Sequence, residues 1–288
     1  MNREDILVEA LPYIKRFAGK TFVIKYGGSV MEDENLKKKF IEDVAMLKLV
    51  GINIIIVHGG GKRINAMLDR VKLEARFEYG QRVTDENVME IVEMVLSGQI
   101  NKDLSSHLSR HGLKAIGVSG KDGNLLLAEK KYVTGAGGEK IDIGFVGQIK
   151  EVNKELLNKM IEEGYVPVIS PVAVGYNGET YNVNADYVAG AVSGAINAEK
   201  LILMSDIKGL YTDIEDESTF ISEITTSKVR EYITDGTISG GMIPKMECCM
   251  HAIRRGTKEV VIIDGRVDHN LLLEIFTNTG NGTMVTQE

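Results

Sequence analysis

The sequence predicts an α/β protein, a three-layer αβα sandwich around a mainly parallel central sheet, arranged in two lobes. Residues 21–25, 52–57 and 200–204 are mainly apolar runs that predict strands, and residues 52–57 have almost no polar interruption, as in a strand that helices cover on both faces. Turn residues and then a helical pattern follow the first two runs. Strands that alternate with helices at this spacing are typical of a parallel sheet.

The composition excludes several classes of protein. The chain has 288 residues, 43% of them hydrophobic and 26% charged, which is ordinary for a globular protein. The net charge of −7 gives no general support for nucleic-acid binding. No apolar run approaches the roughly 20 residues that cross a bilayer. Because Cys248 and Cys249 are neighbours on a predicted helix, we expect no disulfide, which fits a cytoplasmic location. Glu4, Asp5 and Glu9 stand where a hydrophobic signal core would be needed, so we expect no targeting segment.

The remaining elements divide between the two lobes. We expect the boundary near residue 196, giving lobes of residues 1–196 and 197–288. Residues 3–18 form an amphipathic helix that packs on its own subunit or serves as an oligomerisation arm, and the sequence leaves both open. Residues 115–148 resemble β-hairpin material, and residues 280–285 an edge strand.

Two further helix boundaries follow from local patterns. Thr84 and Asp85 are predicted to cap a helix that ends near Gly98. Lys245 is predicted at the end of a glycine-rich loop that begins at Gly236, just before a helix through Cys248.

Two glycine corners suggest phosphate binding. Lys25 stands at the end of the first strand and is followed by Gly27 and Gly28, and residues 59–61 after His58 are three glycines. Glycines let the backbone approach an anion closely, and a following helix directs its positive end at the anion. A tight β-to-α turn without a ligand would need the same glycines, so one corner alone would be weak. The second corner and Lys245 favour a polyphosphate site.

Familiar alternatives do not fit. The Gly19-Lys20-Thr21 run lacks the first glycine of a P-loop and precedes a strand, and neither corner carries G-x-G-x-x-G. Five scattered histidines argue against a zinc site, and His58 is read as a packing residue at a strand end. What remains is Lys25 and Lys245 with Asp186. Two lysines held by one carboxylate suit phosphoryl transfer, which needs positioning and spread positive charge. Arg82 could grip a carboxylate substrate.

Five motifs together resemble the amino-acid kinase family, in the right order over nearly the whole chain. They are Lys25-Tyr-Gly-Gly-Ser, His58-Gly-Gly-Gly, Gly80-Gln-Arg-Val-Thr-Asp, Asn182-Val-Asn-Ala-Asp and Gly240-Gly-Met-Ile-Pro-Lys. The third motif, which contains Arg-Val-Thr-Asp, and the fourth, Asn-Val-Asn-Ala-Asp, resemble those of members that phosphorylate N-acetyl-L-glutamate with ATP in arginine biosynthesis. The family fold implied is the two-lobed αβα sandwich.

The resemblance implies a role for each matching residue. Catalysis would use Lys25, Lys245, Asp186 and Gly28, with Asp186 holding the lysines. N-acetyl-L-glutamate would bind Gly60, Gly61, Arg82 and Asn182. ATP, a cosubstrate whose Mg²⁺ has no protein ligand, would bind the second lobe and the first corner, through Lys25, Gly27, Ser205, Asp206, Gly209 and Lys245.

The chain ends resemble those of arginine-inhibited members. The resemblance implies a homo-oligomer, a hexamer built as a trimer of dimers that the N-terminal helix interlaces. It also implies L-arginine as an inhibitor at Tyr13, His269, Glu274 and Gly280, and it admits a nitrogen-signalling protein as a further partner.

One departure and two alternatives remain. Lys62 stands where the family commonly has proline, which adds positive charge near the substrate helix. The alternatives are a related kinase for another small carboxylate and a catalytically silent arginine sensor on the same fold. A sensor would have no need for Lys25, Lys245 and Asp186.

Overall fold

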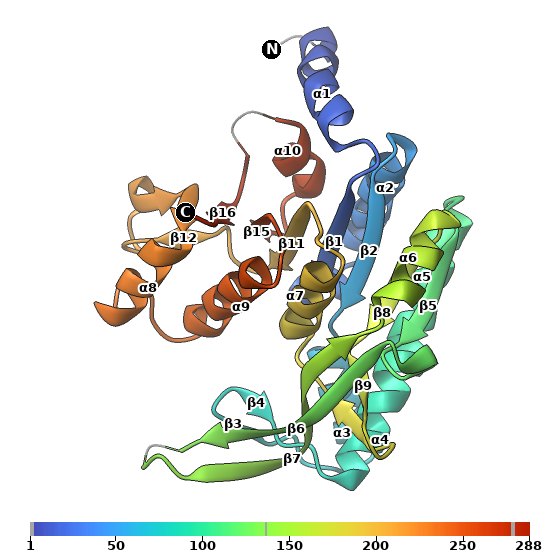
Figure 1. The fold of residues 1–288 in the computed structure, drawn as a ribbon, viewed down its shortest axis with the longest axis vertical. Coiled ribbons are helices and arrows are strands. Elements are labelled where there is room, and N and C mark those ends of the chain that lie inside the picture. Colours follow the sequence, from blue (N-terminus) through green and yellow to red (C-terminus); the bar gives the residue numbers. More distant parts are fainter. Residues whose placement is uncertain (1–2, 136, 278–279) are drawn as a thin grey trace.

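An eight-stranded sheet forms the centre of the computed structural model, which describes residues 3–135, 137–277 and 280–288, with side chains from residue 8 onward. The strand order is β14-β16-β15-β11-β1-β2-β8-β5 (Figure 1). All neighbours pair in parallel except β15 and β16, so the prediction of a mainly parallel sheet is confirmed. The strands are β1 (Thr21–Tyr26), β2 (Asn53–His58), β5 (Ala115–Ser119), β8 (Val166–Ser170), β11 (Lys200–Ser205), β14 (Glu223–Thr225), β15 (Glu259–Asp264) and β16 (Thr283–Thr286).

Helices cover both faces of this sheet, which confirms the three layers. Along β1, Phe22 and Ile24 belong to one buried cluster and Val23 to another, because successive side chains of a strand point to opposite faces. The first cluster includes residues of α1 (Arg3–Phe17), α2 (Glu34–Leu49), α3 (Gly61–Arg70), α4 (Glu86–Glu93), α5 (Asn101–Arg110) and α10 (Asn270–Phe276). The second includes residues of α6 (Lys154–Glu162), α7 (Ala185–Ala195), α8 (Thr226–Thr234) and α9 (Met242–Arg254).

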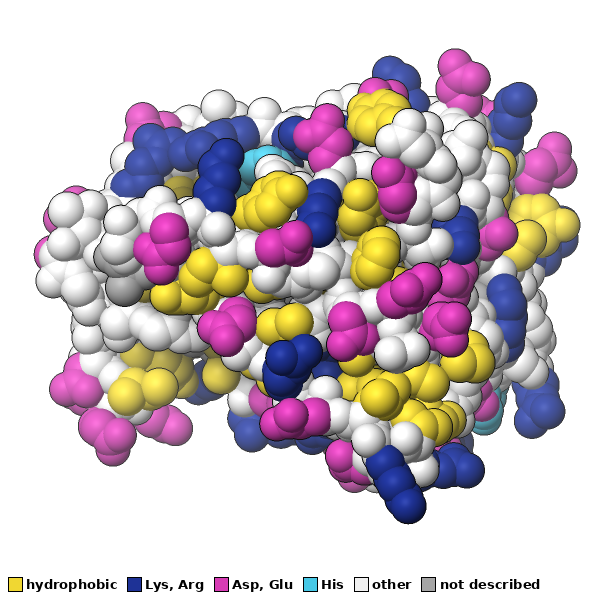
Figure 2. All heavy atoms as spheres, turned by 90° about the horizontal axis from the view of Figure 1, so that it is seen from below, with side chains coloured by type: hydrophobic (Ala, Val, Ile, Leu, Met, Phe, Trp, Pro, Cys, Tyr) yellow, Lys and Arg dark blue, Asp and Glu magenta, His cyan; other side chains and the backbone are white. Residues whose placement is uncertain are grey.

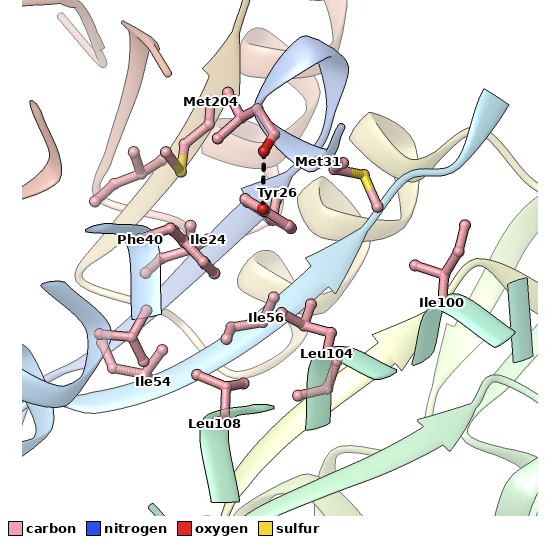
Figure 3. Close-up of a cluster of buried hydrophobic side chains, with 14 of the residues drawn as sticks. Ile24, Tyr26, Met31, Phe40, Ile54, Ile56, Ile100, Leu104, Leu108 and Met204 are labelled. Atoms are coloured by element: carbon pink, nitrogen blue, oxygen red, sulfur yellow. Dashed lines mark hydrogen bonds between the residues drawn. The ribbon is translucent and has the colours of Figure 1, made fainter. Parts of the chain in front are cut away.

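Tyr26 connects the core to the first glycine corner (Figure 3). Its ring stacks on Phe40 with centroids 4.1 Å apart, and its hydroxyl donates to the carbonyl of Val30 at 3.1 Å. Val30 lies in the 3₁₀ turn Gly28–Met31, directly after the corner. The backbone that follows Lys25 is therefore fixed from inside the core.

A smaller group of strands lies below the central sheet in Figure 1. The hairpin predicted over residues 115–148 is confirmed in part: β6 (Leu126–Thr134) and β7 (Lys140–Val152) form it and close a ring with β9 (Val172–Gly175) and β10 (Thr180–Asn182), whereas residues 115–119 form β5 of the central sheet. Two short antiparallel pairs complete the strands: β3 (Phe77–Glu78) with β4 (Gln81–Arg82), and β12 (Leu210–Tyr211) with β13 (Phe220–Ile221).

The structure corrects several predicted boundaries. The helix expected to end near Gly98 continues to Arg110, because a π-helical segment, Met94–Ile100, joins α4 to α5. Asp85 caps α4 by accepting from the Val88 amide at 3.0 Å, whereas Thr84 is buried and donates to a carbonyl. The last strand, β16, is not an edge strand, since β14 pairs with its outer side. Lys245 lies in the first turn of α9 and not at the end of a loop.

No helix in the described part of the chain has both the length and the apolar character needed to cross a membrane.

The two halves of the central sheet come from different parts of the chain. Strands that precede residue 196, the expected lobe boundary, make up the β1-β2-β8-β5 half, and strands that follow it make up the other half.

Candidate active site

The two glycine corners lie side by side because β1 and β2 are parallel neighbours in register. Lys25 pairs with Val57 and Tyr26 with His58, so both strands end at the same edge. The Gly59 amide donates to the Tyr26 carbonyl at 2.8 Å, and a Cβ built on Gly59 would lie only 3.7 Å from the Cα of Gly27. The carboxyl ends of parallel strands are where ligands bind in open α/β sheets.

Asp186 lies between the two predicted lysines. Its Oδ1 is 3.0 Å from Nζ of Lys25, and its Oδ2 is 3.5 Å from Nζ of Lys245. The three side chains keep 15%, 12% and 24% of their surface exposed, so this ion triad is mostly withdrawn from water. The predicted juxtaposition is present in the structure, with the lysines supplied by β1 and α9 and the carboxylate by α7.

Local structure fixes the carboxylate. Asn184 caps α7 by accepting from the Asp186 amide at 2.8 Å, and Cys248 Sγ donates to the Asp186 carbonyl at 3.0 Å. Burial alone would raise the pKa of the Asp186 carboxyl, but the charges of Lys25 and Lys245 outweigh it and hold that pKa below its usual range. Asp186 is therefore an anion at neutral pH.

A side chain at the first corner would displace the charged groups beside it. A Cβ on Gly27 would lie 2.8 Å from Nζ of Lys25, and a Cβ on Gly28 would lie 2.6 Å from Oδ1 of Asp206. Gly28 also has φ +78°, a conformation that L side chains rarely adopt. Asp206 accepts from the Ser29 amide at 2.9 Å and the Ser29 hydroxyl at 2.7 Å. Burial opposes ionisation of Asp206, but these hydrogen bonds lower its pKa.

A cavity of about 270 Å³ opens beside the ion triad. It is lined by both glycine corners, by β4, by Pro171 and by residues 182–186. All four residues predicted to bind the substrate acid lie on its wall, together with Lys25, Gly28 and Asp186; the four are Gly60, Gly61, Arg82 and Asn182.

Hydrogen bonds fix Arg82 at this wall, but they use only part of the donor capacity of its guanidinium. One terminal nitrogen, Nη2, donates to Asn65 Oδ1 at 2.6 Å and to the Gly61 carbonyl at 3.3 Å, and the guanidinium lies over the Phe77 ring at 4.7 Å. Its other terminal nitrogen, Nη1, is buried without a hydrogen-bond partner among the described residues. An unpaired buried donor is costly, so this nitrogen is suited to an anionic ligand.

Asn182 is oriented by Thr84, which the sequence predicted to be a helix cap. Its Nδ2 donates to Thr84 Oγ1 at 3.2 Å, and Thr84 Oγ1 donates to the Arg82 carbonyl at 2.9 Å. Thr84 thus links the two predicted substrate residues. Sequence reasoning missed this role, and it also missed Asn65, whose only signal is its position four residues after Gly61 on the helix.

Two other predicted nucleotide residues lie at the end of the neighbouring strand, β11, and in the segment that follows it. Ser205 ends β11 and is buried, with its carbonyl accepting from the Gly265 amide at 2.9 Å. Gly209 has a packing reason to be glycine, because a Cβ there would lie 2.3 Å from Thr283 Oγ1. That hydroxyl accepts from the Leu210 amide at 2.8 Å. Within the described chain, no group of three or more His, Cys, Asp or Glu residues is placed to hold a metal ion.

Three of the four residues predicted to bind arginine line a second cavity of about 290 Å³: Tyr13, Glu274 and Gly280. The fourth, His269, does not line it. Its Nδ1 contacts Oδ1 of Asp43 on α2 at 2.6 Å. The cavity lies between α1, β15 and α10 and is also lined by Lys200.

Comparison with known proteins places this fold and site in a family. The family model described as "Amino acid kinase family" matches residues 20–264, so the chain belongs to the amino acid kinase family. Among individual relatives, an acetylglutamate kinase of Thermoanaerobacter pseudethanolicus is 53% identical over 286 residues, covering 99% of this chain and 94% of that protein. An acetylglutamate kinase of Trichlorobacter lovleyi is 51% identical over 291 residues, covering 100% and 99%.

Solved structures show the same fold at lower identity. N-acetylglutamate synthase from Neisseria gonorrhoeae, complexed with coenzyme A and N-acetyl-glutamate, superposes with a TM-score of 0.86 at 22% identity. The match covers all of this chain and 64% of that one. A carbamate kinase from Giardia matches with a TM-score of 0.67 at 15% identity, over 94% of this chain and 100% of that one.

Proposed function

We propose that this protein transfers the γ-phosphoryl group of ATP to the γ-carboxylate of N-acetyl-L-glutamate, a step of arginine biosynthesis. The observation that carries the proposal is the ion triad of Lys25, Asp186 and Lys245 beside two glycine corners, across a cavity from the unsaturated guanidinium of Arg82. The choice of substrate is supported by relatives about 50% identical over nearly the whole chain that are acetylglutamate kinases.

The reaction is a direct in-line displacement. A carboxylate oxygen of the substrate forms a bond to the γ-phosphorus, and the bond from that phosphorus to the β–γ bridging oxygen breaks. The products are N-acetyl-L-glutamyl 5-phosphate and ADP. Lys25 and Lys245 stabilise the negative charge that spreads over the moving group and the leaving oxygen. Because the attacking carboxylate is already ionised, no general base is required.

The substrate acid occupies the cavity beside the triad. Arg82 pairs through its free Nη1 with a carboxylate of N-acetyl-L-glutamate, and Asn182 hydrogen-bonds the same molecule. The amides of Gly60 and Gly61 lie at the start of α3, where the positive end of the helix dipole favours an anion.

ATP occupies the part of the site that lies beside the end of β11 and the first turn of α9. In this proposal, residues 1–196 hold the acid and residues 197–288 hold most of the nucleotide, through Ser205, Asp206, Gly209 and Lys245. Lys25 and Gly27 reach across from the first corner, with Gly28 donating to the transferring group. Mg²⁺ arrives bound to the nucleotide phosphates and adds positive charge there.

The second cavity fits L-arginine as an inhibitor. Carboxylates of Glu223, Glu259 and Glu274 line it, as do the cations of Arg16 and Lys200, and this mixture suits a zwitterion with a cationic side chain. Glu274 accepts from the Asn281 and Gly282 amides through Oε2, and its Oε1 lies 3.9 Å from Nζ of Lys200. His269 would join the site only after leaving Asp43.

In this proposal the N-terminal helix both packs on its own subunit and serves as an oligomerisation arm, the two roles that the sequence left open. Phe17 is buried and packs edge-to-face on Phe22 of its own chain, with centroids 5.1 Å apart. Val8 and Leu11 remain 64% and 58% exposed. We propose that this exposed face of α1 joins dimers into a hexamer in the cytoplasm, and that a nitrogen-signalling protein is a further partner.

A coupled ATP-turnover assay with N-acetyl-L-glutamate, with and without arginine, tests the proposal. We expect turnover that arginine suppresses. Turnover only with glutamate, aspartate or carbamate would replace the substrate and keep the fold. A Lys245→Ala variant separates a kinase from a silent sensor, because a kinase should lose turnover far more than substrate affinity whereas a sensor should be indifferent.

A further inference from the structure

His58 is a buried histidine whose two ring nitrogens both have partners next to the active site. It ends β2 with no exposed surface, and the glycine corner at residues 59–61 follows it directly. We propose that His58, itself held by Asn101, orients the Gly59–Gly60 peptide so that the Gly60 N–H points into the substrate cavity. This makes His58 a positioning residue, and the inference rests on the function proposed above.

The hydrogen bonds settle which ring nitrogen carries the proton. Nδ1 lies 2.8 Å from the Gly59 carbonyl oxygen, which can only accept, so Nδ1 is protonated and donates. Nε2 lies 3.2 Å from the amide nitrogen of Asn101, which can only donate, so Nε2 is bare. Asn101 thus selects the tautomer that His58 needs to hold Gly59. Complete burial lowers the pKa of His58 to about 4, which keeps the ring neutral.

The hydrogen bond from His58 to the Gly59 carbonyl also orients the Gly60 N–H, because both groups belong to one peptide unit. In a trans peptide, the carbonyl of one residue and the N–H of the next point in opposite directions. Because His58 holds the Gly59 carbonyl on its own side, the Gly60 N–H must point away from the ring. Gly60 lines the cavity, and none of the described residues accepts a hydrogen bond from its N–H. The amide is therefore available to a ligand.

The π-helical segment Met94–Ile100 supports the corner from the other side. A Cβ built on Gly60 would lie 2.5 Å from Cδ1 of Ile100 and 2.6 Å from Cδ2 of Leu96, and both side chains belong to this segment. Asn101 follows it immediately and also donates to the Val168 carbonyl at 2.8 Å. π-helical turns occur frequently at functional sites. Here the π-helical segment packs the side chains of Leu96 and Ile100 against Gly60, and it places the side-chain amide of Asn101 beside His58.

Two variants at one position separate positioning from packing. The side-chain amide nitrogen of His58→Asn lies near the place of Nδ1 and can still donate to Gly59. The side-chain oxygen of His58→Gln lies near the place of Nε2 and can still accept from Asn101, but nothing replaces the donor to Gly59. We expect His58→Gln to raise KM for N-acetyl-L-glutamate about tenfold, with KM for ATP unchanged, and His58→Asn to retain most of the wild-type kcat/KM.

Since both variants remove the same buried ring, a purely structural role would affect them alike. Equal kcat and KM values for the two variants would overturn the proposal, as would an equal loss toward both substrates. Nitrogen-15 chemical shifts of His58 in the wild-type protein provide a measurement that needs no variant to fold. Nδ1 should be protonated and Nε2 bare at neutral pH, and the opposite tautomer would also overturn the proposal. Failure of the wild type to phosphorylate N-acetyl-L-glutamate would instead overturn the proposed function.

Discussion

Lys25 and Lys245 contact different oxygens of the same carboxylate, 3.0 Å and 3.5 Å from Oδ1 and Oδ2 of Asp186. Lys25 is the second-last residue of a strand in the middle of the sheet, and Lys245 lies in the first turn of a helix more than 200 residues later in the chain. The shared anion therefore sets the separation of two cations that come from different halves of the sheet. Without it, two like charges this close would repel each other.

Replacing Asp186 with asparagine should abolish most catalysis while preserving the fold. The amide keeps the shape of the side chain but cannot neutralise either lysine, so both cations would move away from the transferring group. We expect kcat to fall by at least about a hundredfold, as when one preorganised charge partner is lost. A coupled assay and a thermal melt would check this, with Glu199→Gln as a control at a carboxylate paired with Lys258. A variant with folded stability and a kcat within a few-fold of wild type would contradict the prediction.

Changes at Arg82 should affect the acid substrate and leave the nucleotide largely unaffected. Lysine cannot reproduce both the bond to Asn65 and a second donor toward the cavity, because its ammonium is a single point charge. We expect Arg82→Lys to raise KM for N-acetyl-L-glutamate by at least about tenfold and KM for ATP by less than about twofold. Steady-state kinetics with each substrate varied in turn would measure this. Parallel increases in both KM values would show that Arg82 supports the whole site.

Asp43 should make stability depend on pH between about 4 and 6. Burial, partly offset by the contact with His269, raises the pKa of the Asp43 carboxyl to about 6, above its usual value of 3.8. The folded state therefore holds this proton more tightly than the unfolded state, so the charged carboxylate costs stability that grows as the pH rises through this window. We expect Asp43→Asn to be more stable than wild type at pH 7, by about 1–3 kcal/mol, and similar to it near pH 4. Urea unfolding at both pH values would test this, and an advantage that is the same at both would contradict it.

Sequence alone predicts the residues of the site better than it predicts where the supporting helices end. The glycine corners, Lys25 and the Asp186 motif are local patterns, and the parallel pairing of β1 with β2 brings the two corners together. The end of the helix after Asp85 was misplaced because Gly98 favours termination locally, whereas the π-helical segment packs Leu96 and Ile100 into the core. Such tertiary contacts leave no local signal.

The role of His58 also required the structure. From sequence it is a packing residue, and its burial agrees with that reading. The partners of its nitrogens, Gly59 and Asn101, lie one and 43 residues away. Only the first is visible as a neighbour in the sequence.

The exposed face of α1 should control assembly. Val8 and Leu11 are exposed, whereas Phe17 anchors the helix to its own subunit. We expect a Val8→Asp/Leu11→Asp variant to convert hexamers into dimers, because two charges cannot be buried in an apolar contact between helices. Light scattering after size-exclusion chromatography would show the change, and turnover without arginine should stay near the wild-type value. An unchanged mass would return α1 to a role within one subunit.

Glu274 should couple the second cavity to inhibition by arginine. Its side chain is 7% exposed, and its Oε1 lies 3.9 Å from Lys200, so it offers a nearly dry carboxylate to a guanidinium. A Glu274→Gln variant keeps an oxygen for the Asn281 and Gly282 amides but loses the charge that a cationic side chain requires. We expect the arginine concentration for half-inhibition to rise at least about tenfold, as for loss of a charged hydrogen bond, with turnover in its absence unchanged. Because the cavity lies at the base of α1, Val8→Asp/Leu11→Asp should weaken inhibition as well. Retained inhibition in Glu274→Gln would place the arginine site elsewhere on the molecule.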